Sequence, residues 1–162
     1  MTIIPSQKIY PCLWFDHQAE NAAEFYTSTF PNSKLGSIYY YGEGAPLPAG
    51  TVLTVKFHIE GAEFLALNGG PHFTITPGVS FVIGCETQEK VDYYWEKLGE
   101  GGRYDQCGWL TDKFGVTWQV VPAMLGRLIE IGDGRKTGAM MGAMMEMVKL
   151  DIATLQKAWD EG

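Results

Sequence analysis

The sequence is poor in basic residues, cysteine and long apolar runs, and each shortage excludes a class of function. Its 162 residues hold 12 Lys and Arg against 19 Asp and Glu, which gives a formal net charge of −7 at pH 7. Nucleic acids and anionic membranes are both bound through clustered cations, so neither is expected as a partner. No stretch approaches the roughly 20 apolar residues of a membrane span. Residues 1–12 also lack the basic and apolar regions of a signal peptide, so a cytoplasmic location is expected.

The three cysteines are too few and too scattered to form a structural framework. Cys12, Cys85 and Cys107 are isolated from one another, and no CxxC pair occurs. This pattern indicates neither a disulfide scaffold nor a zinc site. Reduced thiols are therefore expected.

The first half of the chain is predicted to form one strand, then a helix, then three further strands. Residues 8–15 are apolar and aromatic and are typical of a strand, with Pro11 suiting an edge. A helix is predicted from residue 19 to Pro31, because apolar residues recur there at helical spacing. Three antiparallel strands are predicted within 33–70, where a loop rich in glycine and proline separates the first two.

The same order of elements recurs in the second half. Residues 79–85 predict a strand and residues 87–98 a helix capped by Thr87, and three short strands follow as far as residue 121. Residues 8–70 and 79–121 therefore both predict βαβββ, and two such modules can join their sheets.

After Pro122 the chain becomes a helical tail that spans residues 123–162. Its methionines are predicted to share one helical face that packs on the sheet or on a second subunit, rather than to bind a cofactor. The residues expected on this face are Met140, Met141, Met144, Met145 and Val148.

Four segments carry a resemblance to a known family: LWFDHQAENAAEFYTSTFPNS, LNGGPHF, SFVIGCETQEKVDYYWEKLGEGG and CGWLTDKFGVTWQVVP. Together they resemble the vicinal-oxygen-chelate superfamily, and within it the PhnB-like branch that often carries the name 3-demethylubiquinone-9 3-methyltransferase. The resemblance implies a single glyoxalase-like domain over residues 1–162, of α+β class, with a cupped mixed sheet of eight strands and usually a homodimer. It does not imply an activity, because a fold does not determine function.

Metal-using relatives place four ligands in the cup, and the resemblance carries these places to Tyr10, Phe64, Ser80 and Gln119. Only Gln119 can ligate a metal, so no metal and no other cofactor is expected. A shift of one residue in strand register would instead bring Cys12, Glu63 or Cys85 toward the cup. No glycine-rich turn joins a strand to a helix in the way that nucleotide-type cofactors require.

The remaining prediction is an apolar, aromatic cup that binds a small molecule through a few polar atoms. Alternation along the strands places Ala66 beside Phe64, and Thr117 and Val121 beside Gln119. In the alternative, Trp14 and Phe64 fill the cup themselves and Cys107 is structural rather than reactive. The expected ligand-binding residues are Tyr10, Cys12, Trp14, Phe64, Asn68, Ser80, Cys107, Trp109 and Gln119.

Two functions are compatible with these residues. The first is metal-independent binding of a small hydrophobic molecule. The second is an enzyme whose acid or base lies at the mouth of the cup, with Glu43 and His72 as candidates. Whether the modules pair within one chain or across a dimer stays open.

Overall fold

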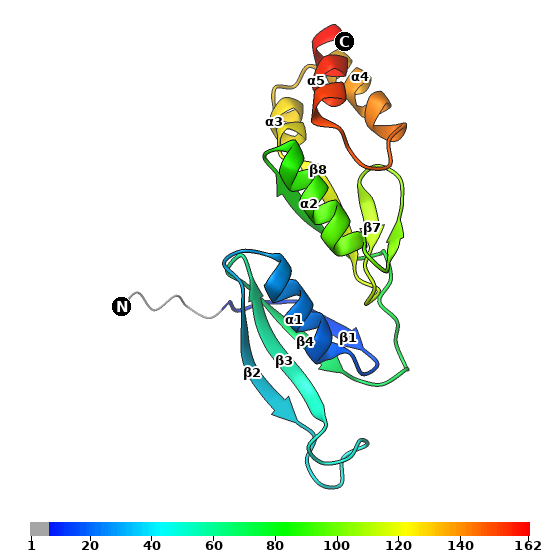
Figure 1. Ribbon diagram of the computed structural model, residues 1–162. Coiled ribbons are helices and arrows are strands. Elements are labelled where there is room, and N and C mark those ends of the chain that lie inside the picture. The colour runs from blue at the N-terminus through cyan, green and yellow to red at the C-terminus, as the bar shows by residue number, and fades with distance from the viewer. Residues whose placement is uncertain (1–6) are drawn as a thin grey trace, which may run out of the picture. The chain divides into compact units, whose positions relative to one another are not determined.

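The computed structural model describes residues 7–162, which form two compact units that divide near residue 75 (Figure 1). Each unit contains a four-stranded mixed sheet with a helix packed against it. Three further helices follow the second sheet, which confirms the α+β class and the helical tail. Within residues 7–162, no helix is both long and apolar enough to cross a membrane.

The first unit has the predicted βαβββ order. Its elements are β1 (Cys12–Phe15), α1 (Ala19–Thr29), β2 (Lys34–Tyr40), β3 (Val52–Ile59) and β4 (Ala62–Asn68). The strands lie in the order β1-β4-β3-β2, with β1 parallel to β4 and the other pairs antiparallel. β1 is shorter than predicted and begins at Cys12. Proline has no N–H to donate, and Pro11 contributes only its carbonyl, which accepts from Leu65 N at 3.0 Å.

The helix α1 packs on its sheet through small residues and stacked rings. Its alanines on the sheet side are fully buried, and Tyr26 stacks on Phe57 with ring centroids 6.0 Å apart. Phe57 in turn stacks on Phe64 at 5.4 Å. The first amide of the helix, Ala19 N, donates to Asn68 Oδ1 at 2.8 Å, so a side chain from β4 caps the helix.

The second unit repeats this order, as the sequence predicts. Its elements are β5 (Ser80–Cys85), α2 (Gln88–Gly99), β6 (Arg103–Tyr104), β7 (Trp109–Thr111) and β8 (Thr117–Pro122). The strand order is β5-β8-β7-β6, again with the first and last strands parallel. The predicted cap is confirmed, since Thr87 Oγ1 accepts from Lys90 N at 3.3 Å.

The tail consists of α3 (Met124–Glu130), α4 (Gly134–Met145) and α5 (Ile152–Glu161). These helices form a small core around the fully buried Met140, with Leu125, Leu150, Leu155 and Trp159. The predicted five-residue apolar face is wrong in part. Val148 lies beyond the end of α4, and Met145 is 67% exposed.

Asp112 organises the turn between β7 and β8. Its carboxylate is 3% exposed. Oδ1 accepts from Phe114 N at 2.8 Å and Val116 N at 3.1 Å, and Oδ2 accepts from Trp118 Nε1 at 2.9 Å. One side chain therefore ties the turn to the core indole of β8.

We expect Asp112→Asn to lower the free energy of unfolding by about 2–3 kcal/mol. The substitution places an amide NH₂ against N–H donors in a site closed to water. Urea denaturation measures the loss. Asp133→Asn is the matched control, because Asp133 also accepts from two main-chain amides, at the start of α4, where asparagine caps equally well. An equal effect of the two substitutions would contradict the role given to Asp112.

Candidate functional site

Each sheet has one face covered by its helix and an opposite face that carries most of the candidate residues. Because side chains alternate along a strand and registered neighbours share a face, the strand pairing assigns every side chain to one side. We define face one as the side opposite α1, with Cys12, Trp14, Thr54, Lys56, His58, Glu63, Leu65 and Leu67. Face two is the side opposite α2, with Ser80, Val82, Arg103, Trp109, Thr111, Thr117 and Gln119.

The prediction that Phe64, Ala66 and Asn68 share a face with Cys12 and Trp14 is wrong. On β4 the residues paired with Cys12 and Trp14 are Leu65 and Leu67. Phe64 is 8% exposed and packs in the ring stack under α1, where Asn68 caps the helix. The physical reason is a one-residue difference in register, which moves every side chain of the strand to the other face.

Trp14 is on face one as predicted, but its ring is engaged within its own module. Its Nε1 donates to Gly70 O at 2.9 Å, and the ring meets Phe73 edge-on with centroids 4.9 Å apart. A Cβ at Gly69 would overlap the indole, so the glycine is what allows the ring to lie there. Trp14 therefore fills space on this face.

Face one also carries a charged cluster that sequence reasoning did not select. Glu63 is 4% exposed, with Oε1 3.1 Å from Lys56 Nζ and Oε2 3.6 Å from His58 Nε2. The carboxylate raises the pKa of Lys56, whose ammonium also lies 5.6 Å from the centre of the Tyr10 ring. A hairpin signal was available in the sequence. The Glu60–Gly61 turn has positive φ at both residues and sets His58 opposite Glu63.

Two buried polar atoms of this cluster lack a hydrogen bond within the described residues: His58 Nδ1 and Glu63 Oε1. Glu63 Oε1 is nevertheless paired with the Lys56 ammonium at 3.1 Å, which leaves His58 Nδ1 as the buried atom of this cluster without a partner among residues 7–162. Such orphaned groups are uncommon in folded proteins and are frequent at functional sites. A carboxylate, an imidazole and an ammonium together can move protons, so face one has the chemistry of an acid–base site.

Face two brings together three of the predicted residues: Ser80, Trp109 and Gln119. Gln119 lies between Val82 on β5 and Trp109 on β7, which are its registered neighbours. Its Nε2 donates to Ser80 Oγ at 2.9 Å. The predicted alternation of Gln119 with Thr117 and Val121 is in agreement with the pairing of β8.

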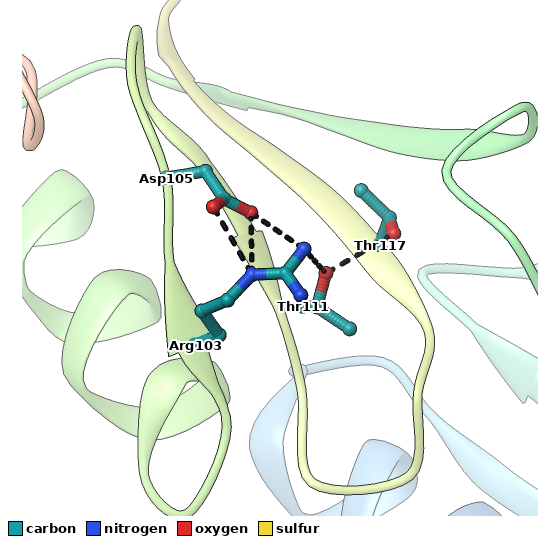
Figure 2. A network of polar contacts seen from close by, with 4 residues as sticks. All are labelled: Arg103, Asp105, Thr111 and Thr117. Atoms are coloured by element: carbon teal, nitrogen blue, oxygen red, sulfur yellow. Dashed lines mark hydrogen bonds and ion pairs between the residues drawn. The ribbon is translucent and has the colours of Figure 1, made fainter.

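A second polar network on face two ends at Arg103 (Figure 2). Arg103 Nε lies 3.1 Å from Asp105 Oδ1, and Nη2 lies 3.1 Å from Asp105 Oδ2. Nη2 also lies 3.5 Å from Thr111 Oγ1, which is 3.4 Å from Thr117 Oγ1. Residues 103–106 were predicted as a short strand, and the structure forms one at Arg103–Tyr104, but neither Arg103 nor Asp105 was predicted as a site residue.

Cys12 and Cys85 are poor nucleophiles, because burial raises the pKa of their thiols. Desolvation raises the pKa of Cys12, and burial raises the pKa of Cys85 to about 11. Cys107 precedes β7 and is not on a strand. Its φ is +60°, and its amide donates to Met147 O at 2.8 Å, so this residue joins the hairpin to the tail.

The candidate acids and bases of the loops are not part of either face. Glu43 and His72 are both exposed, in the loops that follow β2 and β4. Tyr10 precedes β1 and is 39% exposed.

The donor set does not fit a metal ion. Of the four places implied by metal-using relatives, Phe64 faces α1, and only Gln119 has a side chain that can ligate. No group of three or more His, Cys, Asp or Glu side chains within residues 7–162 is arranged to hold a metal.

Comparisons with known proteins give one family and one fold. Residues 7–121 match the sequence profile of the family described as 3-demethylubiquinone-9 3-methyltransferase. A PhnB protein from Bacillus cereus, whose 3-demethylubiquinone-9 3-methyltransferase name is provisional, is 38% identical, covers 70% of this chain and 97% of its own, and has a TM-score of 0.64. A protein from Pseudomonas aeruginosa is 22% identical, covers 70% of this chain and 95% of its own, and shares the fold with a TM-score of 0.57. No curated protein matches the chain.

We expect Lys56→Met to destabilise the protein more than Glu63→Gln does. The first leaves a buried carboxylate without its cation, at about 3 kcal/mol. The second leaves an ammonium that is one-third exposed and can turn to water, at about 1 kcal/mol.

Urea denaturation measures both losses, and Lys149→Met is the matched control. Lys149 Nζ pairs with Asp92 Oδ1 at 2.8 Å, but both side chains are about 40% exposed, so less than about 1 kcal/mol is expected. The reverse order of Lys56→Met and Glu63→Gln would show that Glu63 is not held as a buried anion.

Proposed function

We propose that this chain, which belongs to the family described as 3-demethylubiquinone-9 3-methyltransferase, binds a small, largely apolar molecule at face two without a metal ion. The family match confirms the resemblance to the PhnB-like branch and the glyoxalase-like fold. Neither assigns an activity, because this fold supports many chemistries. The proposal therefore rests on the side chains of face two.

The observation that carries the proposal is the row Val82, Gln119 and Trp109. Val82 is 64% exposed although it lies on a sheet strand, and the half-buried Trp109 is on the other side of Gln119. Apolar surface around one amide is typical of small-molecule sites, in which a few polar atoms orient the ligand. Among the described residues, Gln119 Oε1 has no partner, and the Ser80 hydroxyl keeps its proton free to donate. The pair thus offers one acceptor and one donor.

Metal and methyl-donor chemistry have less support than simple binding. The donor set lacks enough carboxylates, imidazoles and thiolates for a metal. The turn from β1 into α1 reads DHQ and the turn from β5 into α2 reads ET, so neither has the glycines that let a nucleotide-type cofactor approach the backbone. We therefore do not carry the methyltransferase name of the family over to this chain.

The second candidate function is an enzyme that transfers protons, and the cluster on face one favours it. Glu63 is buried, and His58 Nδ1 has no hydrogen-bond partner within residues 7–162. Glu63 can orient the imidazole through Nε2, from which its Oε2 lies 3.6 Å away. Because Nδ1 is itself buried, the ring must turn before this nitrogen can act as a base on a bound molecule. Turnover of a bound molecule that is lost in His58→Gln distinguishes this function from binding alone.

We expect 1-naphthalenemethanol to bind saturably, with the same Kd before and after treatment with EDTA. Val82→Ser is expected to weaken binding about fivefold, equivalent to about 1 kcal/mol of apolar burial. The matched control is Val79→Ser. Val79 is also 64% exposed, but it precedes β5 and, as the neighbour of Ser80, projects to the side opposite face two. NMR titration measures each Kd. Absence of saturable binding, or loss of binding with EDTA, would overturn the proposal.

We propose further that the protein is a homodimer. Ile131 and Met145 are each 67% exposed in the tail, and a second subunit packed there would remove this apolar surface from water. Light scattering at micromolar concentration is expected to report about twice the chain mass of 18.0 kDa. A particle of single-chain mass would contradict the dimer.

A cytoplasmic location also stays a prediction. It is supported by the three cysteines, all of which are free thiols, since secreted proteins of this size more often pair them. Cell fractionation tests it.

A further inference from the structure

We infer that the molecule bound at face two carries a carboxylate, which Arg103 holds while the apolar part lies on Trp109. This inference rests on the proposed binding function and adds the chemical class of the ligand. It comes from three features of face two: a row of hydroxyl groups, a fixed guanidinium with unused donors, and the spacing between two rows of side chains.

The first feature is a polar row that crosses the whole second sheet. Ser80, Thr117, Thr111 and Arg103 are registered neighbours from β5 through β8 and β7 to β6. Each therefore projects from the same side of the sheet. Thr117 is 1% exposed and its hydroxyl lies 3.4 Å from that of Thr111, so Ser80, Thr111 and Arg103 are the members of this row that a ligand can reach.

The second feature is the orientation of Arg103 in Figure 2. Asp105 takes one edge of the guanidinium through Nε and Nη2, and Thr111 lies at the other hydrogen of Nη2. Within residues 7–162, no residue accepts a hydrogen bond from Arg103 Nη1, and the Arg103 side chain is 64% exposed. Asp105 thus fixes the fork and raises the pKa of Arg103, while the donors of Nη1 stay available. Guanidinium groups held in this way recognise carboxylates with a geometric fit that lysine lacks.

The third feature is the distance between the polar and apolar rows. Thr117 and Gln119 are two residues apart on β8, which places the row of Val82, Gln119 and Trp109 about 6–7 Å from the row of hydroxyls. Trp109 is on β7 and Arg103 is on the adjacent strand β6, so a carboxylate on a one-ring or two-ring aromatic body can reach Arg103 while its rings lie on Trp109. The two rows together therefore fit a small aromatic acid better than a neutral apolar molecule.

The test compares 1-naphthoate with 1-naphthalenemethanol, which have the same rings and differ in the acidic group. NMR titration gives Kd from the shift of the Trp109 indole N–H, assigned by its loss in Trp109→Phe. For the unmodified protein we expect 1-naphthoate to bind about tenfold more tightly than the alcohol.

Three arginine variants locate the preference. Arg103→Gln is expected to reduce the preference to less than about twofold, chiefly by weakening 1-naphthoate, and Arg103→Lys is expected to retain part of it. Arg127→Gln is the matched control, because Arg127 makes a similar two-point pair with Glu86 on the surface and is not on face two. It is expected to leave the preference unchanged. Asp105→Asn keeps a side-chain oxygen that orients Arg103 but removes the competing negative charge, and it is expected to tighten 1-naphthoate at least about twofold.

The outcomes separate the two proposals. If the alcohol binds and 1-naphthoate binds no better, or if the preference survives in Arg103→Gln, the carboxylate inference is wrong while the binding function stands. If Asp105→Asn weakens 1-naphthoate, the electrostatic role of Arg103 is wrong. If neither probe shifts Trp109 saturably, the proposed function fails, and this inference fails with it.

Discussion

The parallel pairing between the first and last strands of each module is the constraint on which the rest of the structure depends. β1 lies beside β4, β5 lies beside β8, and one helix in each module covers one face of the resulting sheet (Figure 1). Once that face is covered, strand alternation sends each side chain either under the helix or to the opposite side. The composition of faces one and two therefore follows from strand register. A prediction that is wrong by one residue in register assigns the side chains of the candidate site to the core and those of the core to the site.

The order of elements and three residues of face two, Ser80, Trp109 and Gln119, were predicted from the sequence. Arg103 on face two and the charged cluster on face one were not. On β8, core residues alternate with Thr117, Gln119 and Val121, so the sequence alone indicates which residues of this strand share a face. β4 offers two polar residues of opposite parity, Glu63 and Asn68. Asn68 is polar because it caps α1, and Glu63 is polar because it pairs with Lys56. Sequence alone cannot tell a capping residue from a site residue, since both are polar side chains on an apolar strand.

The two modules repeat a topology without repeating its chemistry. Face one groups a buried carboxylate with an ammonium and an imidazole, whereas face two offers hydroxyls, an amide and exposed apolar side chains. The same βαβββ frame thus carries a charged cluster in one half and the proposed binding surface in the other. This difference is what a family name cannot convey, because the fold determines where a site lies and the side chains determine what it does.

The contrast between two arginines shows how surroundings turn an ordinary ion pair into a candidate site. Arg103 with Asp105 and Arg127 with Glu86 are both exposed two-point pairs, and such pairs add little to stability. Arg127 comes from the short helix α3. Arg103 instead ends a registered row of hydroxyls, beside an apolar row on the same sheet face. The ion pair fixes the direction of the guanidinium, and the neighbouring rows supply the hydroxyls and the apolar side chains on which the proposal of an acidic ligand rests.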